Sequence, residues 1–146
     1  MIEISNLSKA DFVKYNIELV KELLTKQGYQ LFKISQGKAK TDFTICRNNE
    51  SFNIKIIGYR YNEKASGNYA YIRKTAFDLG KFQYLFFVLY LSNQAHILKI
   101  PVAKFKNIEC GSPFKNRDYI GLKSLPEYGI EMNKKNIIEL LMYEEK

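Results

Sequence analysis

Three polar residues in the first half of the chain, Asp42, Asn53 and Lys55, could together act on a phosphate ester. A carboxylate and an amide oxygen can bind a hard cation such as Mg²⁺, which polarises a phosphodiester and activates water. A nearby ammonium can orient that water or stabilise the negative charge that develops on the phosphate. These residue types therefore suggest a magnesium-dependent hydrolytic site, with Asp42 and Asn53 as the metal ligands.

The three residues converge only if two strands pair in one register. Residues 42–47 and 51–60 are rich in β-branched and aromatic side chains, which is typical of strands. Asn48 and Asn49 lie between them and suit a two-residue hairpin loop, because Asn tolerates a positive φ. The sequence therefore predicts a β-hairpin at this point.

That hairpin brings Asp42 opposite Lys55 and Thr44 opposite Asn53. Side chains alternate along a strand, so all four lie on one face, opposite the apolar side chains of the second strand. An acid, an amide and an ammonium would then meet at one accessible place. A simpler interpretation stays open: Asp42 and Lys55 form an exposed cross-strand ion pair, worth ~0.2–1 kcal/mol.

The remaining elements follow from the hydrophobic period and from the turn residues. Apolar residues recur at helical spacing over residues 8–27, with Ser8 as a cap and Gly28 as a stop. Further strands are predicted at residues 29–34, 83–91 and 95–100, further helices at residues 69–79 and 133–142, and mostly loop at residues 104–128. This order predicts an α/β fold with a mixed central β-sheet flanked by helices. We expect a single domain, residues 1–146, with a core at about residues 8–105 and a loop-rich extension and helix at residues 106–146.

The order α-β-β-β-α-β, with Asp42 followed after ten residues by Asn53-Ile54-Lys55, resembles the PD-(D/E)XK nuclease superfamily. The resemblance covers about residues 8–105 and implies a restriction-endonuclease-like fold. It implies that Asp42 is the metal-binding aspartate, that Asn53 stands at the second acidic position and that Lys55 is the catalytic lysine. The activity implied is that of a magnesium-dependent deoxyribonuclease, a hydrolase that leaves 5′-phosphates.

Several positions depart from the family pattern. Thr41 stands before Asp42 where the family has Pro, which is a common variation. Asn53 replaces an acid, and the inward face of the first helix is centred near Asn16, where many members supply a further acid. Glu18 and Glu22 fall outside that face. Amides in place of carboxylates weaken magnesium binding, because cation affinity rises with the charge of the ligands.

The departures leave two hypotheses open. One is an active endonuclease with a variant centre. The other is a catalytically degenerate nuclease-fold module that binds nucleic acid, or a nucleoprotein or defence complex, without cleaving it, as an inhibitor from a phage or a mobile element could.

The charge of the chain favours a polyanionic partner. Lys and Arg number 23 against 15 Asp and Glu, for a net charge of +8. Tyrosines are interleaved with basic residues around the predicted site, which suits contact with phosphates and bases of DNA. The basic residues expected to contact DNA are Lys38, Lys40, Arg60, Lys64, Arg73 and Lys74. A solvated cationic face and an acidic protein partner remain alternatives.

Several classes of protein are disfavoured. No apolar run reaches the ~18–20 residues that span a bilayer, and the first residues lack the order of a secretory signal. Cys46, Cys110 and a single histidine, His96, do not form a disulfide framework or a zinc motif. We therefore expect a cytoplasmic protein with reduced thiols. A homodimer is one way to cover the edges of the apolar strand at residues 83–91.

Overall fold

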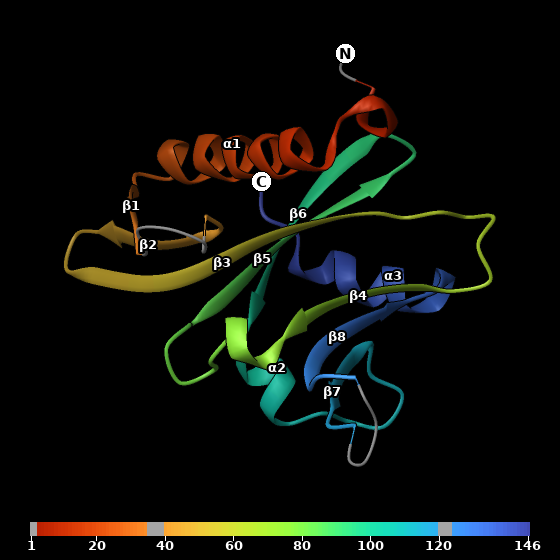
Figure 1. Cartoon of the computed structure of the whole chain (residues 1–146). Helices are drawn as coiled ribbons and strands as arrows, with labels where there is room; N and C mark the ends of the chain where they lie inside the picture. The colour runs from red at the N-terminus through yellow and green to blue at the C-terminus, as the bar shows by residue number, and fades with distance from the viewer. Residues whose placement is uncertain (1–2, 35–39, 120–123) are drawn as a thin grey trace.

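Two β-sheets organise the chain in the computed structural model, which describes residues 3–34, 40–119 and 124–146. A five-stranded mixed sheet contains, in spatial order, β1 (Gln30–Lys33), β2 (Asp42–Arg47), β3 (Glu50–Arg60), β5 (Tyr84–Leu91) and β6 (Gln94–Pro101). A three-stranded antiparallel sheet contains, in spatial order, β4 (Asn68–Arg73), β8 (Glu127–Met132) and β7 (Phe114–Arg117). Helical segments are η1 (Ile4–Asn6), α1 (Lys9–Lys26), η2 (Lys74–Ala76), α2 (Ala103–Lys106), α3 (Lys134–Leu140) and η3 (Leu141–Tyr143). The architecture is therefore α/β (Figure 1).

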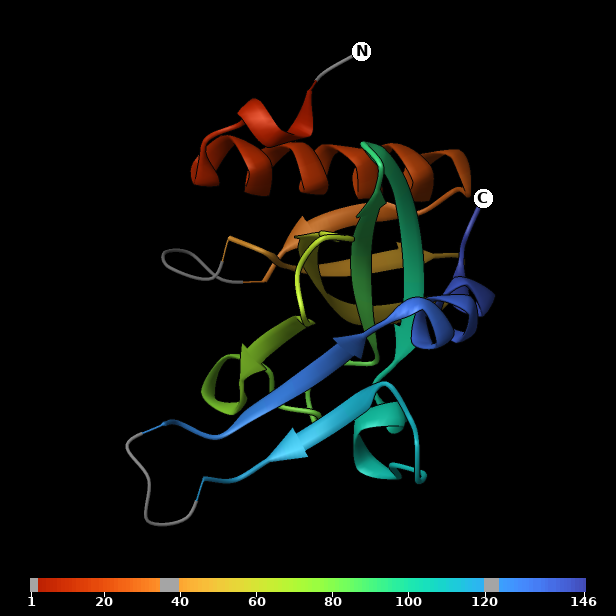
Figure 2. The ribbon, with the colours of Figure 1, turned by 90° about the vertical axis from the view of Figure 1, so that its right-hand side faces the viewer.

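Helix α1 covers one face of the five-stranded sheet, as Figures 1 and 2 show. Val20 and Leu24 are fully buried there, against Ile45, Ile54 and other apolar side chains of the sheet. The helical period predicted this segment, and Ser8 is its N-cap: its Oγ accepts a hydrogen bond from the Asp11 N–H at 3.1 Å.

We expect Ser8→Ala to lower the free energy of unfolding by about 1 kcal/mol, because it leaves an N–H at the helix start without its partner. Urea denaturation followed by far-UV circular dichroism measures this change. Ser8→Asp is the matched control and should retain the stability, since its carboxylate can accept the same hydrogen bond. Equal loss in both variants would contradict the capping role.

The β2–β3 hairpin has the predicted register. Asp42 pairs with Lys55 and Thr44 with Asn53 across antiparallel strands, and Asn48 in the turn has a φ of 56°. A left-handed conformation of this kind is one that Asn adopts more readily than most residues. Strand β3 continues the sheet by pairing in parallel with β5.

The three-stranded sheet lies on the side of the five-stranded sheet away from α1 (Figure 2). Its buried side chains, among them Ile72, Phe114 and Ile130, join Phe87 and Leu98 of the large sheet in a second hydrophobic cluster. The segment beyond residue 106 therefore contributes directly to the core.

Two predictions of secondary structure were wrong in this region. Residues 69–79 contain strand β4 and the single turn η2 in place of a helix, because Ala70 and Ile72 alternate inward while Tyr69 and Tyr71 do not. Residues 104–128, expected mostly as loop, include most of α2, all of β7 and the start of β8. Both errors have one cause: β4 finds its partner, β8, more than fifty residues along the chain.

The apolar strand β5 has neighbours on both sides. It pairs with β3 and β6, and the outer edge of β6 is met by the C-terminal residues, where Glu145 N–H donates to Ile97 O at 2.9 Å. His96 Nδ1 lies 2.8 Å from Glu144 Oε2 at the same edge. The chain itself thus covers both edges of β5. A homodimer stays a prediction, but it is not needed to cover this strand. None of the helices in the described ranges has the length and apolar character needed to cross a membrane.

Candidate functional site

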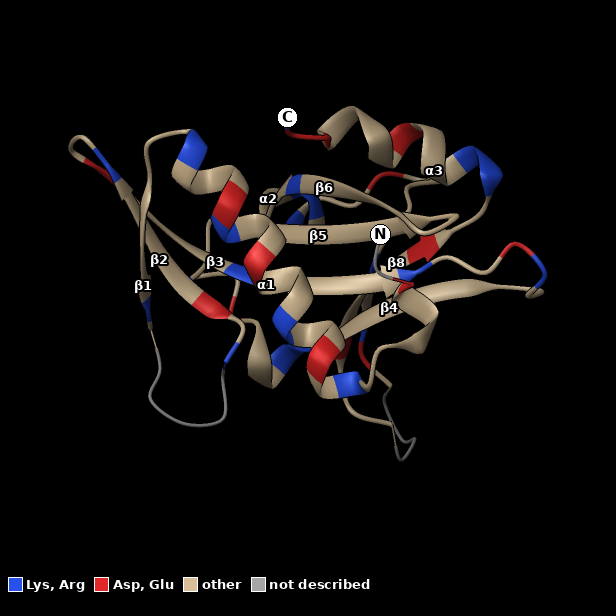
Figure 3. Cartoon of the chain, turned by 90° about the horizontal axis from the view of Figure 1, so that it is seen from above, with Lys and Arg blue, Asp and Glu red and all other residues tan. Residues whose placement is uncertain are grey.

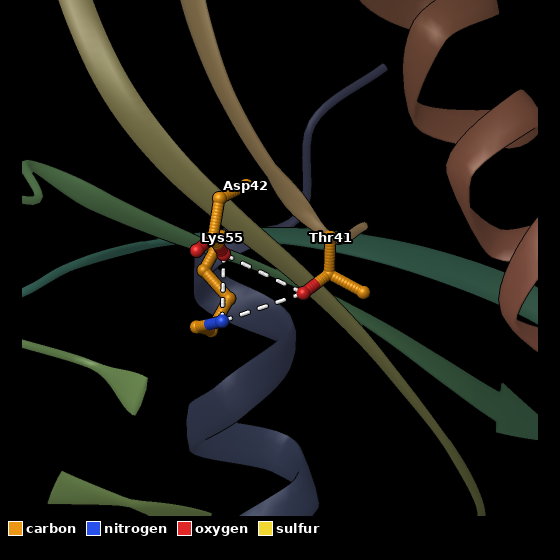
Figure 4. A network of polar contacts seen from close by, with 3 residues as sticks. All are labelled: Thr41, Asp42 and Lys55. Atoms are coloured by element: carbon orange, nitrogen blue, oxygen red, sulfur yellow. Dashed lines mark hydrogen bonds and ion pairs between the residues drawn. The ribbon is translucent and has the colours of Figure 1, made fainter. Parts of the chain in front are cut away.

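Asp42 and Lys55 form an ion pair between β2 and β3. Lys55 Nζ lies 2.6 Å from Asp42 Oδ1, and Thr41 Oγ1 lies 3.3 Å from the same ammonium (Figure 4). Thr41 also approaches Asp42 Oδ1, at 3.4 Å. The sequence predicted this meeting of charges, because it follows from the hairpin register.

The pair is buried, which the sequence did not predict. The side chains of Asp42 and Lys55 are only 10% and 6% exposed. They lie on the face opposite the α1 cluster, where Lys55 Nζ stands 5.8 Å from the centre of the buried Phe82 ring. The accessible location expected for these residues is therefore wrong, and so is the alternative of an exposed ion pair.

Asn53 lies on the same face but bonds to its own neighbours. Its Oδ1 accepts from Thr44 Oγ1 at 2.7 Å, and its Nδ2 donates to Lys81 O at 3.0 Å. Its backbone N–H donates to Gln83 Oε1 at 2.6 Å. Asn53 thereby ties β3 to the segment that leads into β5, which is a structural use of its amide.

The donor set fits magnesium poorly. Mg²⁺ prefers several oxygens, including negatively charged ones, in an octahedral arrangement. Here the single carboxylate, Asp42, is neutralised by Lys55, and the Asn53 oxygen already accepts a hydrogen bond. Within residues 3–34, 40–119 and 124–146, no group of three or more His, Cys, Asp or Glu side chains is placed to hold a metal ion.

Helix α1 supplies an amide and no acid at its inward face. Asn16 is 3% exposed and its Oδ1 accepts a hydrogen bond from Tyr90 Oη. Burial raises the pKa of Tyr90, which keeps this hydroxyl protonated as a donor. Glu18 is exposed, and Glu22 pairs with Lys26 along the helix at 3.3 Å. The structure thus confirms the prediction that Asn16 lies on the face of α1 that packs against the sheet.

An apolar pocket adjoins the pair without containing it. It has a volume of about 270 Å³ and lies between the first half of α1 and β3. Its walls include Phe12, Val13, Asn16, Thr41 and Ile56. Thr41 is the residue that touches both this pocket and the Asp42–Lys55 pair.

Of the predicted DNA-contacting cations within the described residues, Lys40 lies two residues before Asp42, and the others stand elsewhere in the fold. Lys38 lies outside the described residues; Lys40 and Lys64 are exposed in turns. Arg60 ends β3, five residues beyond Lys55 and therefore about 17 Å from it at the usual rise of a strand. Its guanidinium lies 3.9 Å from the centre of the Phe12 ring of α1.

Each of the two remaining cations is paired with an acid that lies in the three-stranded sheet or directly after one of its strands. Arg73 Nη1 lies 3.2 Å from Glu127 Oε1, and Lys74 Nζ lies 3.0 Å from Asp118 Oδ1. Helix α1 carries acidic and basic side chains in alternation, so the face seen from above is of mixed charge (Figure 3). The positive charge of the chain is therefore spread over several elements.

Sequence reasoning named Arg73 as a basic contact residue but missed Glu127, its buried partner on the three-stranded sheet. Glu127 is 5% exposed although it lies near the start of β8, and it meets Arg73 there. Burial, with Glu127 as a neighbour, raises the pKa of Tyr69. The signal that could have revealed this sheet is the period-two pattern of Tyr69, Ala70, Tyr71 and Ile72.

Comparison of the chain with models of protein families, with curated proteins and with solved structures gave no match.

Proposed function

We propose that this chain is a restriction-endonuclease-like module that binds nucleic acid and does not cleave it with magnesium. The observation that carries the proposal is that the three motif residues use their polar atoms in contacts within the fold. Asp42, Asn53 and Lys55 stand in the register that the nuclease motif requires, yet their polar atoms bond to one another, to Thr44 and to the chain before β5. They stabilise the fold where an active member would bind metal.

The topology supports the restriction-endonuclease-like part of the proposal. A helix precedes three antiparallel strands, and β3 then pairs in parallel with β5. The departure is the connection between β3 and β5, which contains β4 and η2 where the resemblance implies a helix.

The charge of the chain supports the binding part. A net charge of +8 attracts phosphates without reading their sequence. Lys40, Arg60 and Lys64 are exposed and stand in turns or at a strand end, where a phosphate can approach them.

Fluorescence anisotropy with labelled duplex and single-stranded DNA tests the binding. We expect the affinity to fall steeply and linearly in a double-logarithmic plot against salt, because binding releases counterions. Addition of a chelator should leave the affinity unchanged. An absence of binding at low salt would overturn the proposal and would favour an acidic protein as the partner of the cationic surface.

Incubation of the same DNA with Mg²⁺ or Mn²⁺ tests the absence of cleavage. We expect no product from linear, branched or single-stranded DNA, with wild type and Asp42→Asn alike. The rival hypothesis, an active nuclease with a variant centre, is supported by the hairpin register, which places Asp42, Asn53 and Lys55 on one sheet face. Cleavage by the wild type that Asp42→Asn abolishes, in a variant that circular dichroism shows to be folded, would establish that rival.

A further inference from the structure

The outer face of the three-stranded sheet carries aromatic and cationic side chains that the Asp42–Lys55 site does not use. On β4, Ala70 and Ile72 point into the core, so Tyr69, Tyr71 and Arg73 point outward. The strand register places Tyr71 and Lys115 on either side of Gly129, and Arg73 and Arg117 on either side of Glu127. We call this face the outer platform and define it by Tyr69, Tyr71, Arg73, Lys115 and Arg117.

Two arginines of the outer platform lie against its tyrosines. The Arg117 guanidinium carbon is 4.4 Å from the centre of the Tyr69 ring, and that of Arg73 is 4.7 Å from the centre of the Tyr71 ring. A cation over an aromatic face is attracted by the ring quadrupole. Both pairs present planar groups at the surface.

Acidic neighbours hold these guanidinium groups in place. Arg73 Nη1 donates to Glu127 Oε1 at 3.2 Å and to Leu125 O at 3.1 Å. Arg117 Nη2 lies 3.7 Å from Glu131 Oε2. Groups held in this way lose little further freedom when a ligand binds.

On the outer platform, the side chains of two arginines and one tyrosine are more exposed than that of the central acid, Glu127. Tyr71 is 52% exposed, and the side chains of Arg73 and Arg117 are 37% and 38% exposed. The carboxylate between the two arginines, Glu127, is only 7% exposed in its side chain. A ligand that approaches there meets an aromatic ring, two guanidinium groups and, at one end, the Glu131 carboxylate, whose side chain is 47% exposed.

Gly129 at the middle of β8 leaves the space that the Tyr69 ring occupies. A Cβ at this position would lie 1.9 Å from Tyr69 Oη, so the tyrosine ring lies across the glycine backbone. At one end of the platform a hollow of about 430 Å³ opens beside Tyr69, Arg117 and Glu131. This hollow has room for a planar group next to a hydrogen-bond donor, Arg117, and an acceptor, Glu131.

We propose that the outer platform binds single-stranded nucleic acid, a proposal that rests on the nucleic-acid binding argued above. Unpaired bases stack on Tyr71 and on the guanidinium planes of Arg73 and Arg117, and the cations, with Lys115, meet the phosphates. Bases of a duplex are stacked on one another and cannot reach these rings. The platform therefore prefers single strands, and its stacking contacts accept any base because every base has an aromatic face.

Tyr71→Ala and Tyr71→Phe test this proposal by anisotropy with a labelled single-stranded oligonucleotide. We expect Tyr71→Ala to weaken binding by about 5- to 150-fold, which corresponds to the loss of one stacked base. Tyr71→Phe should bind as the wild type does, since the ring that stacks is retained. Phe32→Ala is the matched control: Phe32 is a similarly exposed aromatic residue on β1, away from the platform, and its loss should not change the affinity.

The outcomes separate this proposal from the one on which it rests. Binding by the wild type that Tyr71→Ala leaves unchanged would overturn the platform while nucleic-acid binding stands. The same conclusion would follow if Tyr71→Ala weakened duplex and single-strand binding equally, because stacking on unpaired bases cannot act on a duplex. A wild type that binds no nucleic acid at low salt overturns both proposals.

Discussion

Lys55→Met should lower the free energy of unfolding by about 3–5 kcal/mol, because it leaves the buried Asp42 carboxylate without its counter-charge. The ammonium it removes is 2.6 Å from Asp42 Oδ1, and both side chains are almost inaccessible to water. Thr41 Oγ1, at 3.4 Å from the carboxylate, offers one weak hydrogen bond in exchange. Urea denaturation followed by far-UV circular dichroism or tyrosine fluorescence measures the change, since the chain has no tryptophan.

A double variant separates two contributions to the free energy of unfolding: the loss of the ion pair and the burial of an unpaired carboxylate. Asp42→Leu combined with Lys55→Met should recover most of the stability lost in Lys55→Met alone, because apolar side chains replace a buried ion pair at little net cost. Lys26→Met is the matched control: it removes the ammonium of an ion pair that is exposed on α1, and it should leave stability nearly unchanged. If Lys55→Met and Lys26→Met had equal effects, the Asp42–Lys55 pair would not be buried in solution.

Gly58→Ala should lower the free energy of unfolding by about 1–3 kcal/mol by forcing α1 away from β3. A Cβ at residue 58 would lie 2.1 Å from Asn16 Nδ2 and 2.6 Å from Asn16 Cγ. Asn16 cannot swing aside freely, since it is buried and accepts a hydrogen bond from Tyr90 Oη. Thermal or urea denaturation gives the loss.

Gly67→Ala is the control for this substitution. A Cβ at residue 67 would meet no atom within 4 Å, so this variant should be as stable as the wild type or slightly more stable. The effects of Gly58→Ala and Asn16→Ala should also be non-additive, because the smaller side chain at residue 16 removes the clash. Additive losses would show that Gly58 and Asn16 do not touch.

Together, these predictions separate a structural role for the motif residues from a catalytic one. A large loss of stability in Lys55→Met, with DNA binding that a chelator leaves unchanged, is the combination that the proposed non-cleaving module predicts. Magnesium-dependent cleavage by the wild type would instead show that the Asp42–Lys55 pair opens to admit metal.

Local patterns in the sequence were sufficient for the elements on the α1 side of the molecule. Helical spacing and the Ser8 cap predicted α1, and alternation with the Asn48-Asn49 turn predicted the β2–β3 hairpin and its register. These elements form from residues close in the sequence, so the signals that specify them are also local. The same register brings Asp42 opposite Lys55.

Burial of that pair was decided only by the tertiary structure. Nothing between residues 42 and 55 indicates that Phe82 lies beneath Lys55 or that Asn53 bonds to the chain before β5. The three-stranded sheet likewise forms from strands that are far apart in the sequence, since β4 pairs with a strand that begins at Glu127. Local signals specify which residues face one another across a hairpin, because the turn and the two-residue period of the strands fix the register. Whether they meet water or a packed core depended on contacts between distant segments, which no local pattern records.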